Sequence, residues 1–235
     1  MDLKKEFWDE ESYEDFILYL KSLSNVDKID WTKRILNTNK MVLALSSPDL
    51  KKIASLVFKG NYESFLKLNK NSCYEEVAIY GFIINKIKDF DLKVKYLSIY
   101  VNMIDSWALT DLLSFDVKHN EKEFYNLSLE YVKDERPFVR RIGLFILFEF
   151  IDNDNYIEKI FDIMNEFKYE EDYYVNMMNA WLLCEIFIKR RDETLIFLKN
   201  HNLNKFTINK GISKCRDSYR VSDSDKDMLL SYRVK

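Results

Sequence analysis

The residues best suited to chemistry in this sequence are a tryptophan and an aspartate, Trp107 and Asp111, spaced four positions apart in residues 105–111. At positions i and i+4 of a helix, both side chains project from the same face. An indole face attracts a cationic or electron-poor heterocycle, and a carboxylate stabilises positive charge that develops on a sugar. The pair therefore predicts a site on one helix face, where a ring and a carboxylate are neighbours.

Two further residues occur at repeat spacing from this pair. Arg141 follows one repeat later and Trp181 one repeat after that. In a helical repeat protein, equivalent positions on successive inner helices line one groove, so we expect two indoles, a carboxylate and a phosphate-binding guanidinium to converge. Each signal also has a structural interpretation: core packing for Trp107 and Trp181, a helix cap or salt bridge for Asp111, and an ordinary ion pair for Arg141.

Other catalytic chemistries find no support in the sequence. The two histidines, His119 and His201, fall in or beside loop-like stretches and have no second ligand at metal spacing. No phosphate-binding loop, dinucleotide fingerprint or nucleophile elbow is present. We therefore expect no metal, no cofactor and no nucleotide.

The elements that must position these residues are helices. Apolar residues recur at intervals of three and four along almost the whole chain, and only four glycines and two prolines occur. We expect twelve to fourteen helices. One begins at Ser47-Pro48-Asp49, with Ser47 as the N-cap and the proline at the first helical position, and residues 222–225 cap the last helix.

The most apolar segments indicate how the helices stack. Residues 74–87 and 141–150 are apolar on most of their circumference, which predicts inner helices covered on both sides. Apolar helices centred near residues 80, 110, 145 and 180 recur at about 35 residues, in the range of helical-hairpin repeats. We predict an all-α solenoid of antiparallel helix pairs, forming one domain over residues 1–235 with a frayed start at 1–10 and a basic C-terminal cap at 205–235.

Charge is unevenly distributed. The net charge is −3, but residues 189–235 hold 12 Lys or Arg and 6 Asp or Glu, a net of +6, which leaves −9 for the remainder. Such a distribution favours a localised phosphate contact or, equally, a solvated basic end. Residues 205–220 repeat cations at helical spacing and predict either a grip on phosphates or a cap of the last repeat. Those cations are Lys205, Lys210, Lys214, Arg216 and Arg220.

Cysteine usage and hydropathy bear on the compartment. Three widely spaced cysteines, no basic and apolar leader, and no run of 18 uncharged apolar residues predict a cytoplasmic protein without a membrane span.

The sequence resembles the bacterial DNA alkylation repair proteins of the AlkD-like, HEAT-like-repeat superfamily, from about Trp31 to Lys226. No single stretch carries the resemblance, but the order and spacing of the matching stretches together are specific. They are residues 34–38, 47–54, 74–76, 104–111, 139–141, 173–181 and 214–222.

The resemblance implies a curved solenoid of HEAT-like or ARM-like repeats that binds alkylated duplex DNA on its concave face, acting as a monomer at the bacterial nucleoid. The implied activity is a glycosylase that cleaves the N-glycosidic bond of cationic N3- or N7-alkylpurines. By similarity, Trp107 and Trp181 would flank the lesion, Asp111 would stabilise the sugar cation or position water, and Arg141 would contact the backbone. The DNA-binding residues would be Arg140, Lys210, Lys214, Arg216 and Arg220.

Three positions depart from the active members of that family. Ile35 or its neighbours occupy the place of an aromatic tyrosine, a tryptophan expected near Phe138 is replaced, and Cys184 stands where an arginine follows the second tryptophan. The acidic body departs as well. Two alternatives therefore stay open: a non-catalytic relative that binds bulged or branched DNA, and a helical scaffold that binds a protein or peptide.

Overall fold

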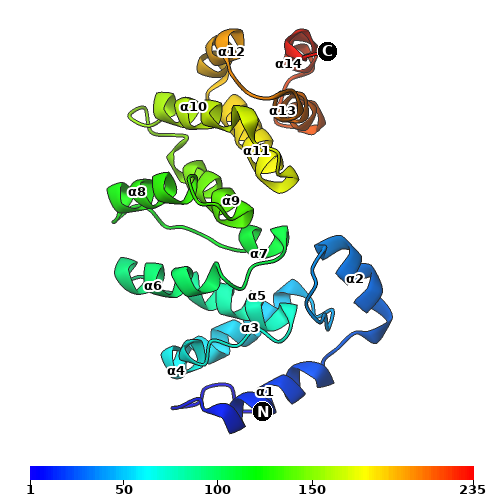
Figure 1. The fold of residues 1–235 in the computed structure, drawn as a ribbon, viewed down its shortest axis with the longest axis vertical. Helices are drawn as coiled ribbons and strands as arrows, with labels where there is room; N and C mark the ends of the chain where they lie inside the picture. Colours follow the sequence, from blue (N-terminus) through cyan, green and yellow to red (C-terminus); the bar gives the residue numbers. More distant parts are fainter. The chain divides into compact units, whose positions relative to one another are not determined.

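The protein is built from helices throughout. The structure is a computed structural model that describes all residues, 1–235, and it contains fourteen α-helices and four short 3-10 helices (Figure 1). The extended backbone forms no sheet, only one isolated bridge between Met41 and Cys73. The all-α prediction and the expected number of helices are confirmed. None of the helices combines the length and apolar character that a bilayer crossing needs.

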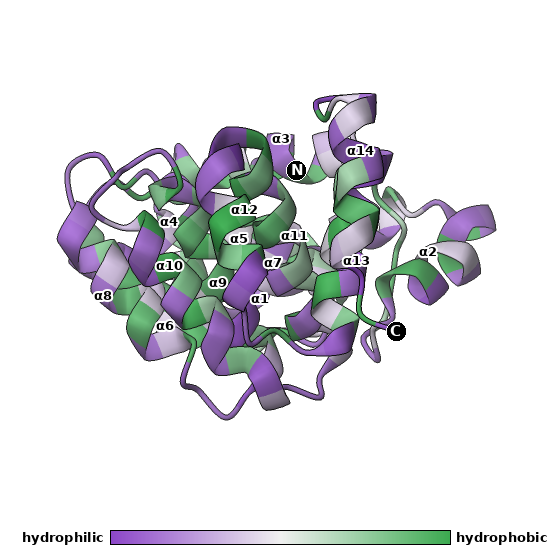
Figure 2. Ribbon diagram, turned by 90° about the horizontal axis from the view of Figure 1, so that it is seen from above, coloured by the Kyte–Doolittle hydropathy of each residue, from purple (hydrophilic) through white to green (hydrophobic).

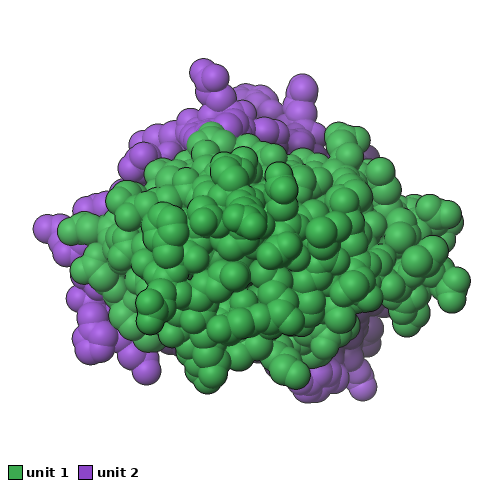
Figure 3. All heavy atoms as spheres, turned by 90° about the horizontal axis from the view of Figure 1, so that it is seen from below, with its two compact units in different colours: residues 1–115 green, residues 116–235 purple.

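The chain divides into two compact units, Met1–Phe115 and Asp116–Lys235, which Figure 3 shows in different colours. The prediction of one domain over the whole chain stays a prediction. Within each unit, neighbouring helices along the chain pack against one another, as in an α-solenoid. The helices of the first unit are α1 (Glu10–Ser22), α2 (Ile29–Leu36), α3 (Ser47–Phe58), α4 (Tyr62–Lys67), α5 (Tyr74–Ile84), α6 (Phe90–Tyr100) and α7 (Trp107–Asp111).

The second unit consists of longer helices. Short 3-10 turns extend α9 at Leu147–Phe150 and α10 at Phe167–Tyr169. The helices are α8 (Glu121–Tyr131), α9 (Pro137–Ile146), α10 (Ile157–Glu166), α11 (Tyr173–Lys189), α12 (Arg191–Asn200), α13 (Lys205–Asp217) and α14 (Asp223–Leu229).

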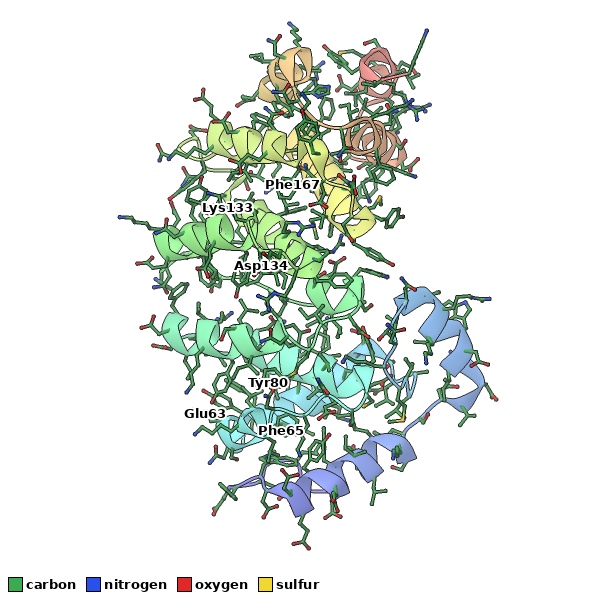
Figure 4. All side chains as sticks on the ribbon, viewed as in Figure 1. Glu63, Phe65, Tyr80, Lys133, Asp134 and Phe167 are labelled. Atoms are coloured by element: carbon green, nitrogen blue, oxygen red, sulfur yellow. The ribbon has the colours of Figure 1, made fainter.

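Helix α5 is the centre of the first unit. All eleven of its residues are buried, which confirms the predicted inner helix, and it packs against α3, α6 and α7. Tyr80, labelled in Figure 4, stacks on Tyr100 of α6 with ring centroids 5.9 Å apart. The close approach depends on Gly81, because a Cβ there would lie 2.6 Å from Leu112 and 2.7 Å from the Tyr100 hydroxyl.

The start of the chain joins this core although no helix begins before Glu10. The side chains of Leu3 and Trp8 are buried. Trp8, Phe16 and Phe65 meet edge to face with centroids 5.1–5.6 Å apart, and Figure 4 labels Phe65 on α4. Whether residues 1–10 fray stays a prediction.

Helix α11 is the centre of the second unit, where it packs against α9, α12 and α13. Ten of its residues are buried, whereas the ribbons of α8 and α10 carry purple, hydrophilic stretches in Figure 2. Gly143 lets α9 approach α8 closely, since a Cβ there would lie 2.6 Å from the Val132 backbone nitrogen. The predicted inner segment 141–150 is confirmed as buried helix, apart from its half-buried Phe145, Phe148 and exposed Glu149.

The predicted N-cap is confirmed at α14 and is wrong by one residue at α3. Ser222 is the N-cap of α14, as predicted, and its side chain accepts a hydrogen bond from the Asp225 amide. At α3 the predicted N-cap is wrong by one residue: Ser46 caps the helix through the Asp49 amide, and Ser47 is the first helical residue. The Ser46 hydroxyl also lies 2.5 Å from the Asp49 carboxylate, so the earlier serine makes the better cap.

Candidate active site

Trp107 and Asp111 are the first and last residues of α7, a helix of only five residues. Ser106 caps the helix, and the Tyr100 hydroxyl donates a 2.8 Å hydrogen bond to the Leu109 carbonyl. Both Trp107 and Asp111 are half-buried, so neither side chain belongs to the closed core. The sequence pattern had suggested a longer apolar helix near residue 110; the structure has a single turn there, held by its neighbours.

The segment before α7 is fastened to the end of α2. The Thr38 hydroxyl lies 2.8 Å from both carboxylate oxygens of Asp105, and the Asn39 amide donates a third bond to Asp105 at 3.0 Å. The Ser106 hydroxyl donates to the Leu36 carbonyl. These bonds join residues more than 65 positions apart in sequence and fix where α7 begins.

The indole of Trp107 is itself anchored. Its Nε1 donates a 3.1 Å hydrogen bond to the carbonyl of Ile35. The buried Thr110 hydroxyl donates to the Trp107 carbonyl at 2.6 Å and lies 2.9 Å from Oδ1 of Asp111. The ring and the carboxylate are therefore held in place by the backbone of α2 and by the residue between them, respectively.

A cavity of about 440 Å³ opens beside this pair. It is lined by residues of α2, α3, α5 and α7 and by Leu45 and Leu112. Its walls include three aromatic and three charged side chains, a combination that suits a cationic aromatic ligand. These six are Tyr74, Phe82 and Trp107, and Lys51, Glu75 and Asp111.

Glu75 is the buried charge of the cavity wall. Its Oε1 accepts hydrogen bonds from the amides of Leu43 at 3.0 Å and Ala44 at 2.8 Å, while its Oε2 is buried without a partner. Burial raises the pKa of the Glu75 carboxyl, against the opposing effect of those amides. The bonds hold the loop before α3, where Ala44 adopts a left-handed φ of 57°.

The neighbouring phenol responds to the same environment. Burial, and then the negative charges of Glu75, Asp105 and Asp111, raise the pKa of Tyr74. Tyr74 therefore stays a neutral phenol at every physiological pH. The sequence analysis did not predict Tyr74 and Glu75 as site residues; they occur there only within a stretch that resembles the family. The available signal was a glutamate pair inside an otherwise apolar helix, since a buried carboxylate needs a hydrogen-bonding reason to be there.

The other two predicted catalytic residues lie in the second unit. Arg141 on α9 is buried, and its Nη1 donates a 2.6 Å hydrogen bond to the Tyr174 carbonyl on α11. Trp181 on α11 is half-buried, stacks against Phe145 and donates a 3.3 Å bond from Nε1 to Glu185. That these two residues form one site with Trp107 and Asp111 stays a prediction.

The predicted DNA-binding residues differ in how far the protein itself engages them. Arg140 forms a two-pronged pair with Glu170, at 2.7 and 2.9 Å, and also donates to two backbone carbonyls. Arg220 forms a similar pair with Glu185, which raises the pKa of the arginine. By contrast, Lys210, Lys214 and Arg216 form no ion pair.

The three positions that depart from the resembled pattern are also explained by local packing. The Ile35 carbonyl receives the Trp107 indole, so its backbone serves the site while its side chain is exposed. Phe138 packs on Tyr174 with centroids 5.6 Å apart. Cys184 is buried in the second unit, beside Cys215 of α13.

Comparison with known proteins points to one family. A family model described as DNA alkylation repair enzyme matches residues 16–215. The match includes α2 to α12 and most of α1 and α13, and therefore all four predicted catalytic residues. No curated protein matches the chain significantly.

Proposed function

Because the chain belongs to the family of DNA alkylation repair enzymes, we propose that it removes cationic N3- or N7-alkylpurines from duplex DNA as a glycosylase. The observation that carries the proposal is the cavity in which the Trp107 indole and the Asp111 carboxylate are neighbours on one helical turn. The family supplies the DNA substrate, and the cavity supplies the groups that this reaction needs.

The proposed reaction carries positive charge first on the base and then on the sugar, and Trp107 and Asp111 are suited to stabilise these two charges. In a cationic alkylpurine nucleotide, the bond between C1′ and the base nitrogen breaks with its electron pair moving to the base, which becomes neutral. The sugar is left as an oxocarbenium ion, which water attacks at C1′ with loss of a proton. The Asp111 carboxylate stabilises the sugar cation, and the indole of Trp107 faces the cationic base before it leaves.

Proton donation to the leaving base is not required. The base leaves as a neutral molecule because it begins as a cation, so no general acid has to act on it. The cavity agrees with this requirement, since its charged residues other than Asp111 are the exposed Lys51 and the buried, hydrogen-bonded Glu75. Arg141 and Trp181 would act on the backbone and on the lesion from the second unit, as the resemblance implies.

The test is release of 7-methylguanine from methylated duplex DNA under single-turnover conditions. We expect wild-type protein to release the base, and Asp111→Asn, which keeps the shape but loses the charge, to be about 100-fold slower or worse. Asp91→Asn is the matched control, because Asp91 is an exposed carboxylate in the first turn of α6. Absence of release by wild-type protein in excess over DNA, with DNA binding intact, would exclude the glycosylase.

That outcome would favour a second candidate, a non-catalytic DNA-binding member of the family. The observation in its favour is that the guanidiniums of Arg140 and Arg220 are already paired with carboxylates of the protein. Such a protein would bind duplex, bulged or branched DNA in a salt-sensitive way and leave the bases in place.

A further inference from the structure

A second cavity, of about 470 Å³, lies on the second unit where α13 meets the segment that follows α14. It holds three cations, one aromatic ring, an amide and a hydroxyl, and no acidic side chain. Its lining residues are Lys205, Phe206, Asn209, Lys210, Ser213 and Arg233. We call this cavity the basic pocket.

The three cations of the basic pocket have no anionic partner. The side chains of Lys205, Lys210 and Arg233 form neither an ion pair nor a hydrogen bond, although Lys210 lies 6.0 Å from the Phe206 ring centroid. Three other arginines in the same quarter of the chain, Arg190, Arg191 and Arg220, are paired, for example Arg191 with Asp225 at 2.7 Å. Three unpaired cations around one hollow repel one another, and an anion placed between them relieves that repulsion.

Hydrogen bonds and an aromatic contact hold the walls of the basic pocket in place. Asn209 binds the backbone of Val234 twice: its Nδ2 donates to the carbonyl at 2.8 Å and its Oδ1 accepts from the amide at 3.0 Å. These two hydrogen bonds fix Val234, the residue that follows Arg233, and so keep the arginine beside α13. On the other side, Phe206 packs edge-on against Tyr173, with centroids 5.6 Å apart.

We propose that the basic pocket binds a backbone phosphate of duplex DNA. The inference rests on the proposed function for its DNA substrate. It places Lys205 and Lys210, which belong to the cations at helical spacing, around one phosphate together with Arg233, which the sequence pattern did not indicate. A phosphate oxygen cluster accepts hydrogen bonds in several directions, which matches two lysines and an arginine converging from two segments. Lys214, one turn after Lys210 on α13, and Arg216 extend the unpaired cations beyond the pocket.

The experiment measures binding of an unmodified DNA duplex as a function of salt. We compare wild-type protein with the triple variant Lys205→Ala, Lys210→Ala, Arg233→Ala. One phosphate contact contributes about 0.9 to the slope of log affinity against log salt concentration. We therefore expect the slope of the triple variant to be smaller by about one unit and its affinity at low salt to fall about tenfold or more.

The matched control removes the same charge from elsewhere in the second unit. Lys118→Ala, Lys122→Ala, Lys133→Ala changes three exposed lysines on or beside α8, of which Lys133 is labelled in Figure 4. We expect its slope to equal that of wild type. Equal slopes for the pocket variant and the control variant would overturn the proposal, as would failure of wild-type protein to bind the duplex at low salt.

A further variant separates a built pocket from mere positive charge. Asn209→Ala keeps all three cations but releases the segment that carries Arg233, and we expect it to lose part of the affinity that the triple variant loses. Wild-type affinity for this variant would contradict a positioned arginine. Base release by wild-type protein is measured separately. A reduced salt slope of the triple variant, without base release by wild-type protein, supports the phosphate site and rejects the glycosylase. An unchanged salt slope of the triple variant, with base release by wild-type protein, rejects the phosphate site alone.

Discussion

Glu75 is a charged residue in an environment that carboxylates seldom occupy. Glu75 is 1% exposed, and the two amides that donate hydrogen bonds to it belong to a loop in which Ala44 has a left-handed backbone conformation. A carboxylate is buried in this way only where it replaces hydrogen bonds that the backbone otherwise lacks. We expect Glu75 to shape the cavity wall by holding this loop.

Replacing Glu75 tests that role. Glu75→Ala leaves the buried Leu43 amide and the partly buried Ala44 amide without an acceptor, so we expect the free energy of unfolding to fall by roughly 2–5 kcal/mol. Glu75→Gln keeps the acceptor oxygen and should cost much less. Urea unfolding monitored by circular dichroism measures both, and equal losses for the two variants would contradict the assigned hydrogen bonds.

The same residue gives a dependence on pH. The pKa of Glu75 is raised in the folded state, so as pH rises above the ordinary carboxyl range the unfolded chain loses this proton first. The free energy of unfolding should therefore fall as pH rises through the interval between the ordinary and the raised pKa. Glu75→Gln should remove this contribution, as the difference between the two unfolding curves against pH will show.

At the residue scale, the sequence predicts which residues share a helix face better than it predicts the partners that they contact. The i, i+4 spacing of Trp107 and Asp111 is sufficient to place both on one turn. The partner of Arg140 is 30 positions away, in the loop before α11, and that of Trp107 is 72 positions away on α2. Local periodicity carries no information about such contacts, because they depend on how helices stack.

At the scale of elements, glycines mark where helices come closest. A Cβ on Gly143 would meet backbone of the preceding helix, whereas a Cβ on Gly211 would meet first the end of the Leu183 side chain, at 2.7 Å. Backbone yields less readily than a leucine methyl group, so the two positions should tolerate alanine differently.

We expect Gly143→Ala to destabilise the protein by about 1–3 kcal/mol, because the new methyl group meets backbone. Gly211→Ala should cost less, because the Leu183 side chain can move and the gain in helix propensity then offsets more of the loss. The two variants control for each other, since both add one methyl group to a buried helix. Thermal and urea unfolding measure the difference. A larger loss for Gly211→Ala would contradict the close approach of α8 and α9.

The helices themselves are largely predictable from sequence, and the loops are not. Apolar spacing predicts α5 and α11, and serine predicts the cap of α14. The loop between α2 and α3 has no such signal, because its conformation is imposed by Glu75 and Asp105 from other segments. The cavity is lined in part by this loop, so its shape could not be foreseen.

At the scale of the whole molecule, the net charge of −3 conceals a basic C-terminal quarter. The structure adds that several of its cations are already paired, such as Arg190, Arg191 and Arg220, while those of α13 are not. The net charge of the segment therefore overstates the number of cations that are available to bind DNA phosphates.

We therefore expect weaker salt dependence than the +6 of that segment suggests. If the basic pocket, Lys214 and Arg216 each neutralise one phosphate, the slope of log affinity against log salt is about −2.7. Raising monovalent salt from about 50 to 200 mM should then reduce affinity about 40-fold, measured by fluorescence anisotropy with a labelled duplex. A slope near −6 would indicate that the paired arginines open to bind DNA.

The anchoring of Trp107 also makes the protein its own optical probe. The indole is half-buried, donates its N–H to a fixed carbonyl and lines the cavity, whereas Trp8 is fully enclosed and Trp31 is largely in solvent. The fourth tryptophan, Trp181, is also half-buried, so Trp181→Phe isolates the signal of Trp107. We expect a cationic purine stacked on the Trp107 ring to accept an electron from the excited indole and so to quench its emission. Occupancy of the cavity is thus readable as intrinsic fluorescence, in unlabelled protein and without waiting for a bond to break.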